Sequence, residues 1–490
     1  MSSEGMPAFD RAVEALIARG PGRMIPDLDR ITRLADLMGQ PQLAYPTVHV
    51  TGTNGKGSIV RMVGALCAAA GMSAGTFTSP HLQSIRERLT LAGRHISERR
   101  FAEVHAEVAQ LADLLDEQAG PDGDHVTFFE LLTAMAYWWF ADAPVDVGIF
   151  EVGMGGTWDA TNLVRGDVAV LSAIDLDHSE LGSTPEEVAG EKSGIIKAGS
   201  EVIVGRQQPE VLARLEAAAR AADAARLHRL GTELEVLDRR IAVGGQQLTL
   251  RVGERVVDDI LLPLFGAHQA DNAALALGAF AALTGDSLDA MDDEVIRHGL
   301  GAVTVPGRME VVHRGPTVVL DGAHNPHGAR AAAATIGEAF EFRDVILVAA
   351  CLEAKDVEGI LAGLRDLADH VVVTEAPSPR TASLERMHRA ATATWADTDV
   401  AVEVAEDLPT ALDLAEQLAG EGDGVLVAGS LFTVGGARDR YLPVTDPGDE
   451  VVYEPDDLDE EEGITPLDEL EETADRQTFS DALDRLLDED

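Results

Sequence analysis

The hydrophobic positions of the chain alternate between short apolar runs and longer stretches with helical spacing. From about residue 46 to 205, the short runs predict strands and the stretches between them predict helices. The predicted strands are 46–51, 73–78, 145–151, 167–173 and 201–205, and the predicted helices include 57–70, 98–118, 127–141 and 184–196. This alternation predicts a mostly parallel sheet with helices on both faces. The residues before it, up to about 45, predict two short helices.

The pattern changes over residues 232–262 and then repeats in a second form. Within that segment, alternating residues predict a hairpin that turns at Gly244 and Gly245. A helical stretch over 268–300 closes this part of the chain. A second alternation follows, with predicted strands at 317–321, 345–351, 370–374, 400–404 and 424–428. The fold class is therefore α/β, with an N-terminal domain over 1–302, a smaller Rossmann-like α/β domain over 303–442, and a tail over 443–490.

Composition bounds the class of protein. With 490 residues, of which 46% are hydrophobic, the chain can bury large cores. Its two cysteines, Cys67 and Cys351, lie in apolar runs, which excludes a disulfide framework and fits a reducing compartment. The longest apolar run, 131–141, is too short to span a bilayer, and the N-terminus lacks the apolar core of a signal peptide. We therefore expect a cytoplasmic protein without a membrane partner.

The charge of the chain argues against nucleic acid as a partner. The formal net charge is −47, and residues 446–490 hold 20 acids and two arginines. The rest of the chain still carries −29, so phosphates would be repelled by the whole fold. The acidic tail is expected to be disordered.

Lysine is scarce, with four residues against 34 arginines, and this scarcity draws attention to Lys56. It lies in a glycine-rich turn between a predicted strand and a predicted helix, where backbone N–H groups can face an anion. The segment consists of Gly52, Thr53, Asn54, Gly55, Lys56, Gly57 and Ser58. Gly57 departs from the strict phosphate-loop pattern, so an ordinary glycine turn is the alternative. Without a guanine-selecting N-K-x-D motif, ATP is the preferred nucleotide, and the first domain is predicted to be of the P-loop ATPase type.

Acids and a histidine follow the predicted strands of the first domain. Glu151 ends one strand, at the edge where open α/β sheets bind ligands, and is a candidate Mg²⁺ ligand. His178 ends another strand within Asp-Leu-Asp-His, either as a second ligand or as a surface group. Lys192 lies on a helix further along, where an ion pair with a neighbouring glutamate is the alternative. Trp158 stands where a dinucleotide fingerprint needs a third glycine, which excludes that motif.

The second domain has its own polar loop after a predicted strand. Asp321, His324 and Asn325 crowd one short segment, Asp-Gly-Ala-His-Asn-Pro. A turn explains the Asp, Gly, Asn and Pro but not the histidine. Arg308, in Val-Pro-Gly-Arg at the predicted linker, could reach a nucleotide held between the domains.

Together, these segments resemble the folylpolyglutamate synthase/dihydrofolate synthase family, within the Mur-type ligases. The resemblance runs from about residue 25 to 442. Its motifs are 52–58 (GTNGKGS), 78–82 (TSPHL), 87–88 (ER), 129–130 (FE), 151–156 (EVGMGG), 159–162 (DATN), 177–178 (DH), 191–194 (EKSG), 268–269 (HQ) with Asn272, 306–308 (PGR), 321–325 (DGAHN) and 429–431 (GSL). Their order and spacing are more specific than any one of them.

The resemblance implies a role for each matching residue. The loop 52–58 holds the ATP phosphates, and Ser58, Ser79, Glu151 and His178 bind Mg²⁺. Lys192 becomes carbamylated and holds a second Mg²⁺, which requires an amine that can lose its proton. The nucleotide also contacts Asn272, Arg308 and Asp321, while His324 and Ser430 lie near the reacting glutamate. The remaining substrate-binding positions are Pro80, His81, Phe129, Glu130 and Asp159; Lys355 and Arg380 match less distinctively.

The implied reaction is ATP-driven amide formation, in which L-glutamate is added to a folate or pteroate carboxylate through an acyl phosphate. The resemblance also implies two Mg²⁺ ions, a monovalent cation as a further cofactor, small-molecule partners and a monomeric enzyme. Alternatives are a related ligase acting on a cell-wall or amino-acid polymer precursor, and a non-catalytic nucleotide-binding protein. Two departures concern local shape: only Ser179 and Glu180 separate His178 from the following Leu-Gly, and Thr157 stands where arginine is common.

Overall fold

The computed structural model describes residues 6–20, 22, 25–121, 123–176, 179–285 and 290–444. These residues belong to one compact unit, Met1–Thr445. The acidic tail from residue 445 onward lies outside the described ranges, so its predicted disorder stays a prediction.

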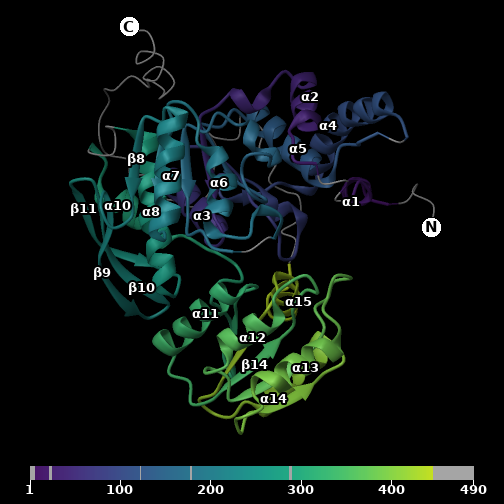
Figure 1. The fold of residues 1–490 in the computed structure, drawn as a ribbon, viewed down its shortest axis with the longest axis vertical. Helices are drawn as coiled ribbons and strands as arrows, with labels where there is room; N and C mark the ends of the chain where they lie inside the picture. Colours follow the sequence, from purple (N-terminus) through teal and green to yellow (C-terminus); the bar gives the residue numbers. More distant parts are fainter. Residues whose placement is uncertain are drawn as a thin grey trace, which may run out of the picture. The chain divides into compact units, whose positions relative to one another are not determined.

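The first half of the chain, coloured purple to teal in Figure 1, forms an eight-stranded sheet with the order β4-β3-β2-β5-β1-β6-β7-β8. Its parallel strands are β1 (Thr47–Thr51), β2 (Ala74–Phe77), β5 (Val147–Glu151), β6 (Val168–Leu171), β7 (Glu201–Val204) and β8 (Arg226–Arg229). Antiparallel β3 (Leu89–Leu91) and β4 (Arg94–His95) complete one edge. β1 is central, because it pairs with β5 on one side and β6 on the other. The loop after β1 therefore opens between two other strand ends.

Helices cover both faces of this sheet, as the alternation of strands and helices along the chain predicts. One face packs against α3 (Lys56–Ala69), α8 (Ala267–Thr284) and α10 (Asp293–Gly301). The other face packs against α1 (Ala8–Ala18), α2 (Asp29–Leu37), α4 (Glu98–Ala119) and α5 (Phe128–Asp142), and further along against α6 (Pro185–Lys192) and α7 (Pro209–Ala222). Every residue of β1 and β5 is buried, which is what a sheet covered on both faces requires.

We call the elements from α1 to α10 the first lobe. It also contains a small antiparallel sheet. This sheet consists of β9 (Leu234–Ala242), β10 (Gly245–Val252) and β11 (Arg255–Leu262). The predicted hairpin at Gly244 and Gly245 is confirmed, because Gly245 pairs with Ala242 across the turn. β11 is a third strand that the pattern did not indicate. Apolar side chains of this sheet share the core around α8.

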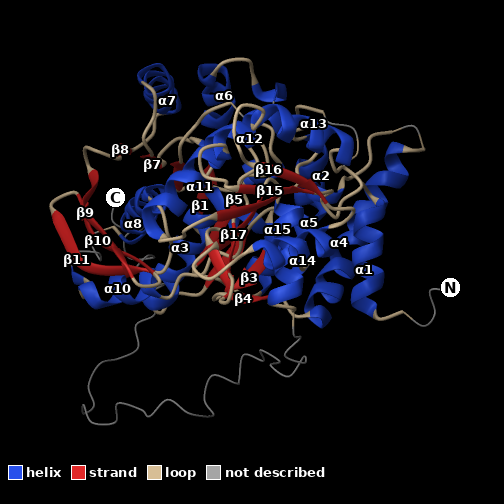
Figure 2. Ribbon diagram, turned by 90° about the horizontal axis from the view of Figure 1, so that it is seen from below, coloured by secondary structure: helices blue, strands red, loops and turns tan. Residues whose placement is uncertain are grey.

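The second lobe, β12 to α15, contains a six-stranded sheet with the order β12-β13-β17-β14-β15-β16. Its strands are β12 (Glu310–His313), β13 (Thr317–Leu320), β14 (Val345–Ala349), β15 (His370–Val373), β16 (Ala401–Val404) and β17 (Gly424–Ala428), all parallel except β12. Helices α11 (Pro326–Ala339), α12 (Val357–Leu364) and α13 (Leu384–Thr394) cover one face; α14 (Leu408–Leu418) and α15 (Leu431–Tyr441) cover the other. Figure 2 shows the strands of both sheets between helices.

The predicted α/β class and both alternations are confirmed, and several predicted boundaries are wrong. The helix predicted over 184–196 ends at Lys192 and continues as one 3₁₀ turn. The helical stretch predicted over 268–300 is interrupted within the described residues, because α8 ends at Thr284, Gly285 takes φ +54°, and α10 begins at Asp293. The prediction also left β3, β4, α7 and β8 unassigned. No helix in the described part of the chain is long and apolar enough to cross a membrane.

Polar contacts join the two lobes at separate places. The Arg239 guanidinium on β9 makes a two-pronged ion pair with Glu338 on α11, at 2.5 and 2.8 Å. Gln83, in the loop after β2, donates to Asp439 on α15 at 2.8 Å. Leu82 beside it lies against Gly435, where a Cβ atom would stand 2.3 Å from the Leu82 carbonyl oxygen. The loop after β2 therefore touches both lobes.

The aromatic cluster behind β5 gives a test of the fold. Phe150 is fully buried, and its ring centroid lies 5.5 Å from that of Tyr137 and 5.6 Å from that of Phe140. We expect Phe150→Ala to lower the free energy of unfolding by about 3–5 kcal/mol, because the cavity cannot collapse in so rigid a cluster. Denaturant unfolding measures this. Val243→Ala, at a fully exposed turn, is the control and should stay within about 0.5 kcal/mol; a Phe150→Ala loss no larger than that would contradict the assigned core.

Candidate active site

The glycine-rich loop turns tightly out of β1 into α3. Gly52 has φ +148°, and a Cβ atom there would stand 1.8 Å from the Ser172 hydroxyl oxygen. That hydroxyl donates to the Asn54 carbonyl at 2.6 Å, while the Thr53 hydroxyl donates to the Asp175 carbonyl at 2.8 Å. The loop is therefore fastened to the end of β6. Its N–H groups and the start of α3 form the kind of concave surface that binds phosphate.

Two lysine amines meet at one backbone oxygen of this loop. Lys56 Nζ lies 3.1 Å from the Gly52 carbonyl oxygen, and Lys192 Nζ lies 2.9 Å from the same atom. Lys192 is 3% exposed and comes from the end of α6. Its two neighbouring glutamates are engaged elsewhere, Glu187 with Ser183 and Glu191 with Thr157. Two ammonium groups this close repel each other, and the site would favour a polyanion that binds both.

Glu151 ends β5 beside the loop and is 5% exposed. Its Oε2 accepts from the Ser79 N–H at 3.1 Å, and Gly57 leaves room for it, since a Cβ atom there would lie 3.3 Å away. Burial raises the pKa of Glu151, and the nearby positive charge of Lys56 opposes that rise. A carboxylate suits Mg²⁺, a hard cation that prefers oxygen ligands and usually keeps several waters.

The predicted metal ligands meet only in part within the described residues. Glu151 and Ser79 are brought together, and Ser58 lies buried in the first turn of α3, next to Gly57. His178 falls outside the described residues, so its role as a ligand stays a prediction. Among the residues that the structure describes, no three His, Cys, Asp or Glu side chains form a metal-binding group. One carboxylate plus hydroxyls still fits Mg²⁺, whose protein ligands are often few.

The predicted nucleotide contacts come from both lobes. Asn272, on α8, lies so close to Gly55 that a Cβ atom on the glycine would stand 2.6 Å from its Oδ1. Asp321, at the end of β13, is 7% exposed and accepts from the N–H groups of Met309 at 3.1 Å and Ala323 at 2.9 Å. Burial raises the pKa of Asp321, and Arg308 opposes the rise.

Helix α11 of the second lobe begins against the phosphate loop. Asn325 caps this helix by accepting from the Gly328 N–H at 2.7 Å, and its amide donates to Asn54 Oδ1 at 3.1 Å. The Asn54 amide nitrogen lies 3.1 Å from His327 Nδ1. His324 Nδ1 lies 2.8 Å from the Gly322 carbonyl oxygen. These contacts bring the Asp-Gly-Ala-His-Asn loop to the phosphate loop.

Three further predicted residues lie on the second lobe. Ser430 is 1% exposed and caps α15 by accepting from the Phe432 N–H at 3.2 Å. Arg380 lies over the ring of that same Phe432, with its guanidinium carbon 5.4 Å from the ring centroid. The backbone carbonyl of Lys355 accepts from Arg386 at 3.3 Å. These contacts all lie within the second lobe.

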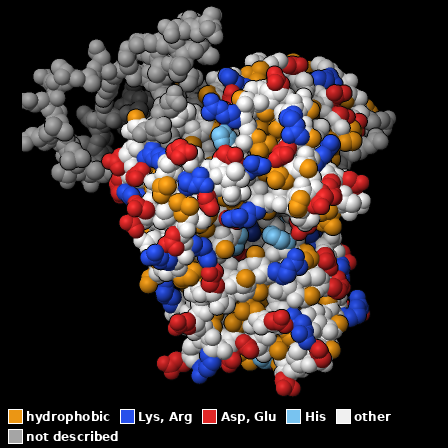
Figure 3. Space-filling view, turned by 60° about the vertical axis from the view of Figure 1, so that its left-hand side comes forward, with side chains coloured by type: hydrophobic (Ala, Val, Ile, Leu, Met, Phe, Trp, Pro, Cys, Tyr) orange, Lys and Arg blue, Asp and Glu red, His pale blue; other side chains and the backbone are white. Residues whose placement is uncertain are grey.

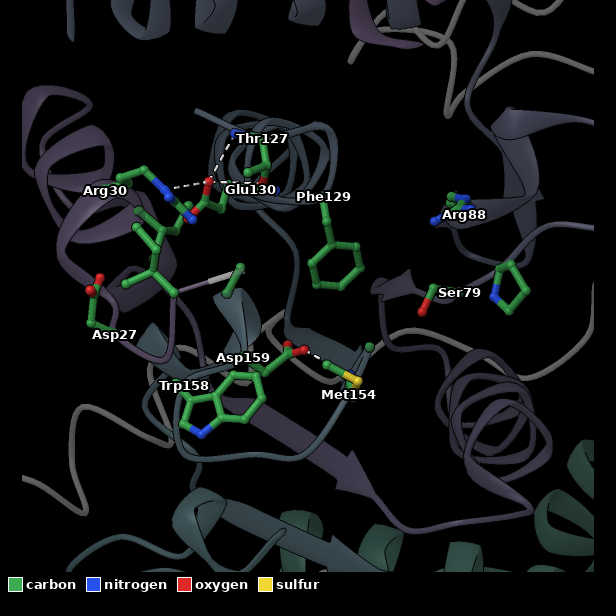
Figure 4. Close-up of a pocket in the computed structure, with 15 residues that line it drawn as sticks. Asp27, Arg30, Ser79, Arg88, Thr127, Phe129, Glu130, Met154, Trp158 and Asp159 are labelled. Atoms are coloured by element: carbon green, nitrogen blue, oxygen red, sulfur yellow. Dashed lines mark hydrogen bonds and ion pairs between the residues drawn. The ribbon is translucent and has the colours of Figure 1, made fainter. Parts of the chain in front are cut away.

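A cavity of about 350 Å³ lies beside the loop after β2 (Figure 4). Figure 4 shows Phe129 and Glu130 on its α5 side, Asp159 and Trp158 in the loop after β5, and Ser79 across from them. Pro80 also lines it, so five predicted site residues share one cavity: Ser79, Pro80, Phe129, Glu130 and Asp159. His81 does not line the cavity, but it accepts from Arg88 Nε at 2.8 Å. Burial and Arg88 lower the pKa of His81 to about 4, which keeps its ring neutral at pH 7.

Glu130 has a structural task that the sequence prediction overlooked. Its carboxylate accepts from the Thr127 N–H at 2.9 Å and from the Thr127 hydroxyl at 2.8 Å, while Thr127 caps α5 in return. Arg30 on α2 also pairs with it at 3.0 Å. The Thr-x-x-Glu spacing is the sequence signature of a capping box and could have revealed this. Glu130 therefore fixes the cavity wall even before any ligand is considered.

Arg88 is the main cavity residue that the sequence prediction gave no role. It is 9% exposed, lines the cavity, and lies over the Phe128 ring with its guanidinium carbon 5.4 Å from the centroid. Burial lowers its pKa to about 10, so it stays charged at pH 7. A buried cation facing a cavity attracts anionic groups such as carboxylates. Arg88 directly precedes β3, and the pairing of β3 with β2 places it at the cavity. The hydrophobic pattern did not predict β3, so it could not place Arg88.

Comparison with known proteins agrees with this geometry. Residues 50–280 match the family model of the Mur ligase middle domain, and residues 307–431 match that of the Mur ligase, glutamate ligase domain. The dihydrofolate synthase/folylpolyglutamate synthase of Mycobacterium tuberculosis is 44% identical over 86% of this chain and 91% of its own length. That of Bacillus subtilis is 32% identical over 85% and 95%.

Solved structures show the same likeness in three dimensions. Mycobacterium tuberculosis folylpolyglutamate synthase complexed with ADP has a TM-score of 0.83 and 42% identity, covering 89% of this chain and 98% of that one. Escherichia coli FolC in complex with DHPP and ADP has a TM-score of 0.77 and 29% identity, covering 90% and 99%. The resemblance inferred from the motifs is confirmed: the chain belongs to the dihydrofolate synthase/folylpolyglutamate synthase family of the Mur ligases.

Proposed function

We propose that this protein is an ATP-dependent ligase that joins L-glutamate to the carboxylate of a pteroate or a folate and releases ADP and phosphate. The observation that carries the proposal is the adjacency of the phosphate loop and the cavity through Ser79, which lines the cavity and donates to Glu151 beside the loop. The cavity, at about 350 Å³, has the size of a small-molecule site. ADP and DHPP in the related structures support a nucleotide and a pteridine-type acceptor here.

The reaction proceeds in two steps. An oxygen of the acceptor carboxylate attacks the γ-phosphorus of ATP, the bond from that phosphorus to the bridging oxygen breaks, and ADP leaves. The ammonium group of glutamate first loses a proton. The resulting amine then attacks the acyl carbon of the acyl phosphate, inorganic phosphate leaves with the C–O bond electrons, and the nitrogen gives up a second proton to leave the amide. Lys56 and the backbone N–H groups of its loop would stabilise the charge that builds on the phosphoryl oxygens. Arg88 would orient the acceptor.

Metal ions belong to this proposal. Ser58, Ser79, Glu151 and His178 would hold one Mg²⁺, and a carbamate on Lys192 would hold a second. When bound, Mg²⁺ supplies charge neutralisation at the phosphates.

We propose in addition that the enzyme is a cytoplasmic monomer with only small-molecule partners and with domains over 1–302 and 303–442. Acidic and basic side chains are interspersed over the described part of the face in Figure 3, which supports partners other than nucleic acid. A monovalent cation as a further cofactor stays a prediction.

The relatives named above favour a folate-type acceptor over the cell-wall alternative, because their names specify dihydrofolate and folylpolyglutamate. Both names apply to one protein in each case, which supports a bifunctional enzyme here. The non-catalytic alternative has less support, since the phosphate loop, Glu151 and Lys192 lie together.

Product mass tests the proposed function directly. With ATP, Mg²⁺ and L-glutamate, the protein should convert dihydropteroate to dihydrofolate and extend tetrahydrofolate by glutamate. Lys56→Ala should lower both rates by about 10³-fold, because electrostatic stabilisation of the phosphoryl oxygens is lost. Arg240→Ala, an exposed cation on β9, is the matched control and should keep the wild-type rate. ATP-dependent product formation at full rate by Lys56→Ala would overturn the assigned role of the loop.

Metal dependence tests the position of Glu151. Excess EDTA should abolish the activity, and Mg²⁺ should restore it. Glu151→Gln keeps the shape but removes the charge, so the Mg²⁺ concentration for half-maximal rate should rise by about tenfold or more. An exposed acid, Asp366→Asn, serves as the control. An unchanged Mg²⁺ requirement in Glu151→Gln would remove this residue from the metal site.

The chemistry of Lys192 can be separated from its charge. Lys192→Arg keeps a cation near Gly52 but cannot carry a carbamate, since a guanidinium does not lose its proton. We expect its rate to fall by about 10²-fold, close to that of Lys192→Ala, if the carbamate places a metal ion. Steady-state rates at saturating ATP measure this. Substantial activity in Lys192→Arg alone would show that the residue acts only as a cation.

A further inference from the structure

Three buried polar side chains form a chain of hydrogen bonds behind the cavity wall. His49 lies on β1 and is fully buried, as is Thr161 in the 3₁₀ turn after the cavity loop. His49 Nε2 lies 2.8 Å from Thr161 Oγ1, and Thr161 Oγ1 lies 2.5 Å from Asp159 Oδ1. Asp159 itself lines the cavity (Figure 4). The chain of bonds therefore runs from the central strand to the cavity.

The donors and acceptors in this chain can be assigned from its chemistry. An ionised carboxylate only accepts, so the Thr161 hydroxyl must donate to Asp159. The hydroxyl oxygen then accepts from His49 Nε2–H, which places the single ring proton on Nε2. His49 Nδ1 is left as a lone pair, and it is one of the buried atoms without a hydrogen-bond partner among the described residues. Burial lowers the pKa of His49 well below its usual value, which agrees with a neutral ring.

Asp159 is held by further donors on both oxygens. The Thr161 N–H donates to Oδ1 at 3.0 Å, and the Met154 N–H donates to Oδ2 at 2.9 Å. The carboxylate therefore cannot rotate without breaking several bonds. Oδ1 already accepts two bonds, so Oδ2 is the oxygen with a lone pair left for an N–H or O–H group that enters the cavity. A second hydrogen bond also joins β1 to the loop after β5, because the Thr51 hydroxyl donates to the Gly155 carbonyl at 2.8 Å.

We propose that His49 and Thr161 are positioning residues, which hold Asp159 as a fixed acceptor for the hydrogen-bond donors of the acceptor substrate. We call the hydrogen-bond chain from His49 through Thr161 to Asp159 the relay. It starts on β1, and Gly52 of the phosphate loop follows that strand directly. The same strand thus sets the position of the cavity wall and of the phosphate loop. This proposal rests on the proposed function, because it assigns Asp159 to acceptor binding.

Substitutions that remove one hydrogen bond at a time test the relay. Thr161→Val keeps the shape but removes the hydroxyl, and His49→Phe fills the site without a donor. Each should raise KM for dihydropteroate or tetrahydrofolate by roughly tenfold, as loss of a hydrogen bond to a charged group does. KM for ATP should change by less than about twofold, since the phosphate loop keeps its own contacts. Asp159→Asn is the reference and should raise the acceptor KM at least as much.

Conservative variants separate a relay from simple packing. Gln carries an N–H donor at about the place of His Nε2, and Ser keeps the hydroxyl. His49→Gln and Thr161→Ser should therefore recover most of the acceptor affinity. The double variant His49→Phe/Thr161→Val should behave like Thr161→Val alone, because the second bond acts only through the first. Thr284→Val, which removes a buried hydroxyl bonded to its own helix, is the matched control and should leave every KM unchanged.

The outcomes are distinct. Equal rises in the acceptor KM for His49→Phe and His49→Gln, additive effects in the double variant, or parallel changes in all KM values would overturn the relay. Wild-type protein that forms no glutamate-containing product with either acceptor would instead overturn the proposed function. A selective rise in acceptor KM with recovery in the Gln and Ser variants would support the relay.

Discussion

The carbonyl oxygen of Gly52 is the atom on which the site depends. Lys56 approaches it from the start of α3 and Lys192 from the end of α6, at 3.1 and 2.9 Å. Each amine is thereby held near the glycine-rich loop. As unmodified cations the two amines would repel each other, and either a ligand with several negative charges or a carbamate on Lys192 would relieve that repulsion. That one carbonyl ties together three elements, β1, α3 and α6, whose packing must be correct before phosphate can bind.

The position of β1 in the sheet explains why the site gathers there. It pairs with β5 and β6, so the loops after all three strands open at the same edge. Glu151 ends β5, and Ser172 after β6 supports the phosphate loop. Val48 and Val50 of β1 pack in the core around α3 and α8. His49, between them, points to the other face of the sheet and supports the cavity wall through Thr161. One central strand therefore positions both the glycine-rich loop and the wall of the cavity.

The second lobe contributes at its helix starts and loops. Asn325 caps α11 and contacts Asn54, so the N-terminus of that helix is held against the phosphate loop. Gln83 and Leu82 link the loop that carries Ser79 to α15. Residues of the second lobe thus contact two loops of the first lobe, the one after β1 and the one after β2, which suits a reaction whose acyl phosphate must be kept from water.

The sequence determined the α/β class, both alternations and the position of the glycine-rich turn between β1 and α3. Apolar runs at strand spacing and glycines between strand and helix are local signals, so they can be found without a structure. Family motifs also placed Glu151, Lys192 and Asp321 among the candidates. The helical stretch predicted over 268–300 contains a break after Thr284 that the prediction did not place, because periodicity alone does not show where a helix ends.

Only the tertiary structure decided which of these residues meet. Lys192 reaches Gly52 across 140 positions of sequence, and Arg88 faces the cavity only because β3 pairs with β2. Glu130 is bound by Thr127 and Arg30, which no strand pattern indicates. The hydrogen-bond chain from His49 to Asp159 likewise joins two segments more than a hundred residues apart. Spacing along the chain sets local geometry, but contacts between distant segments depend on how the sheet orders its strands.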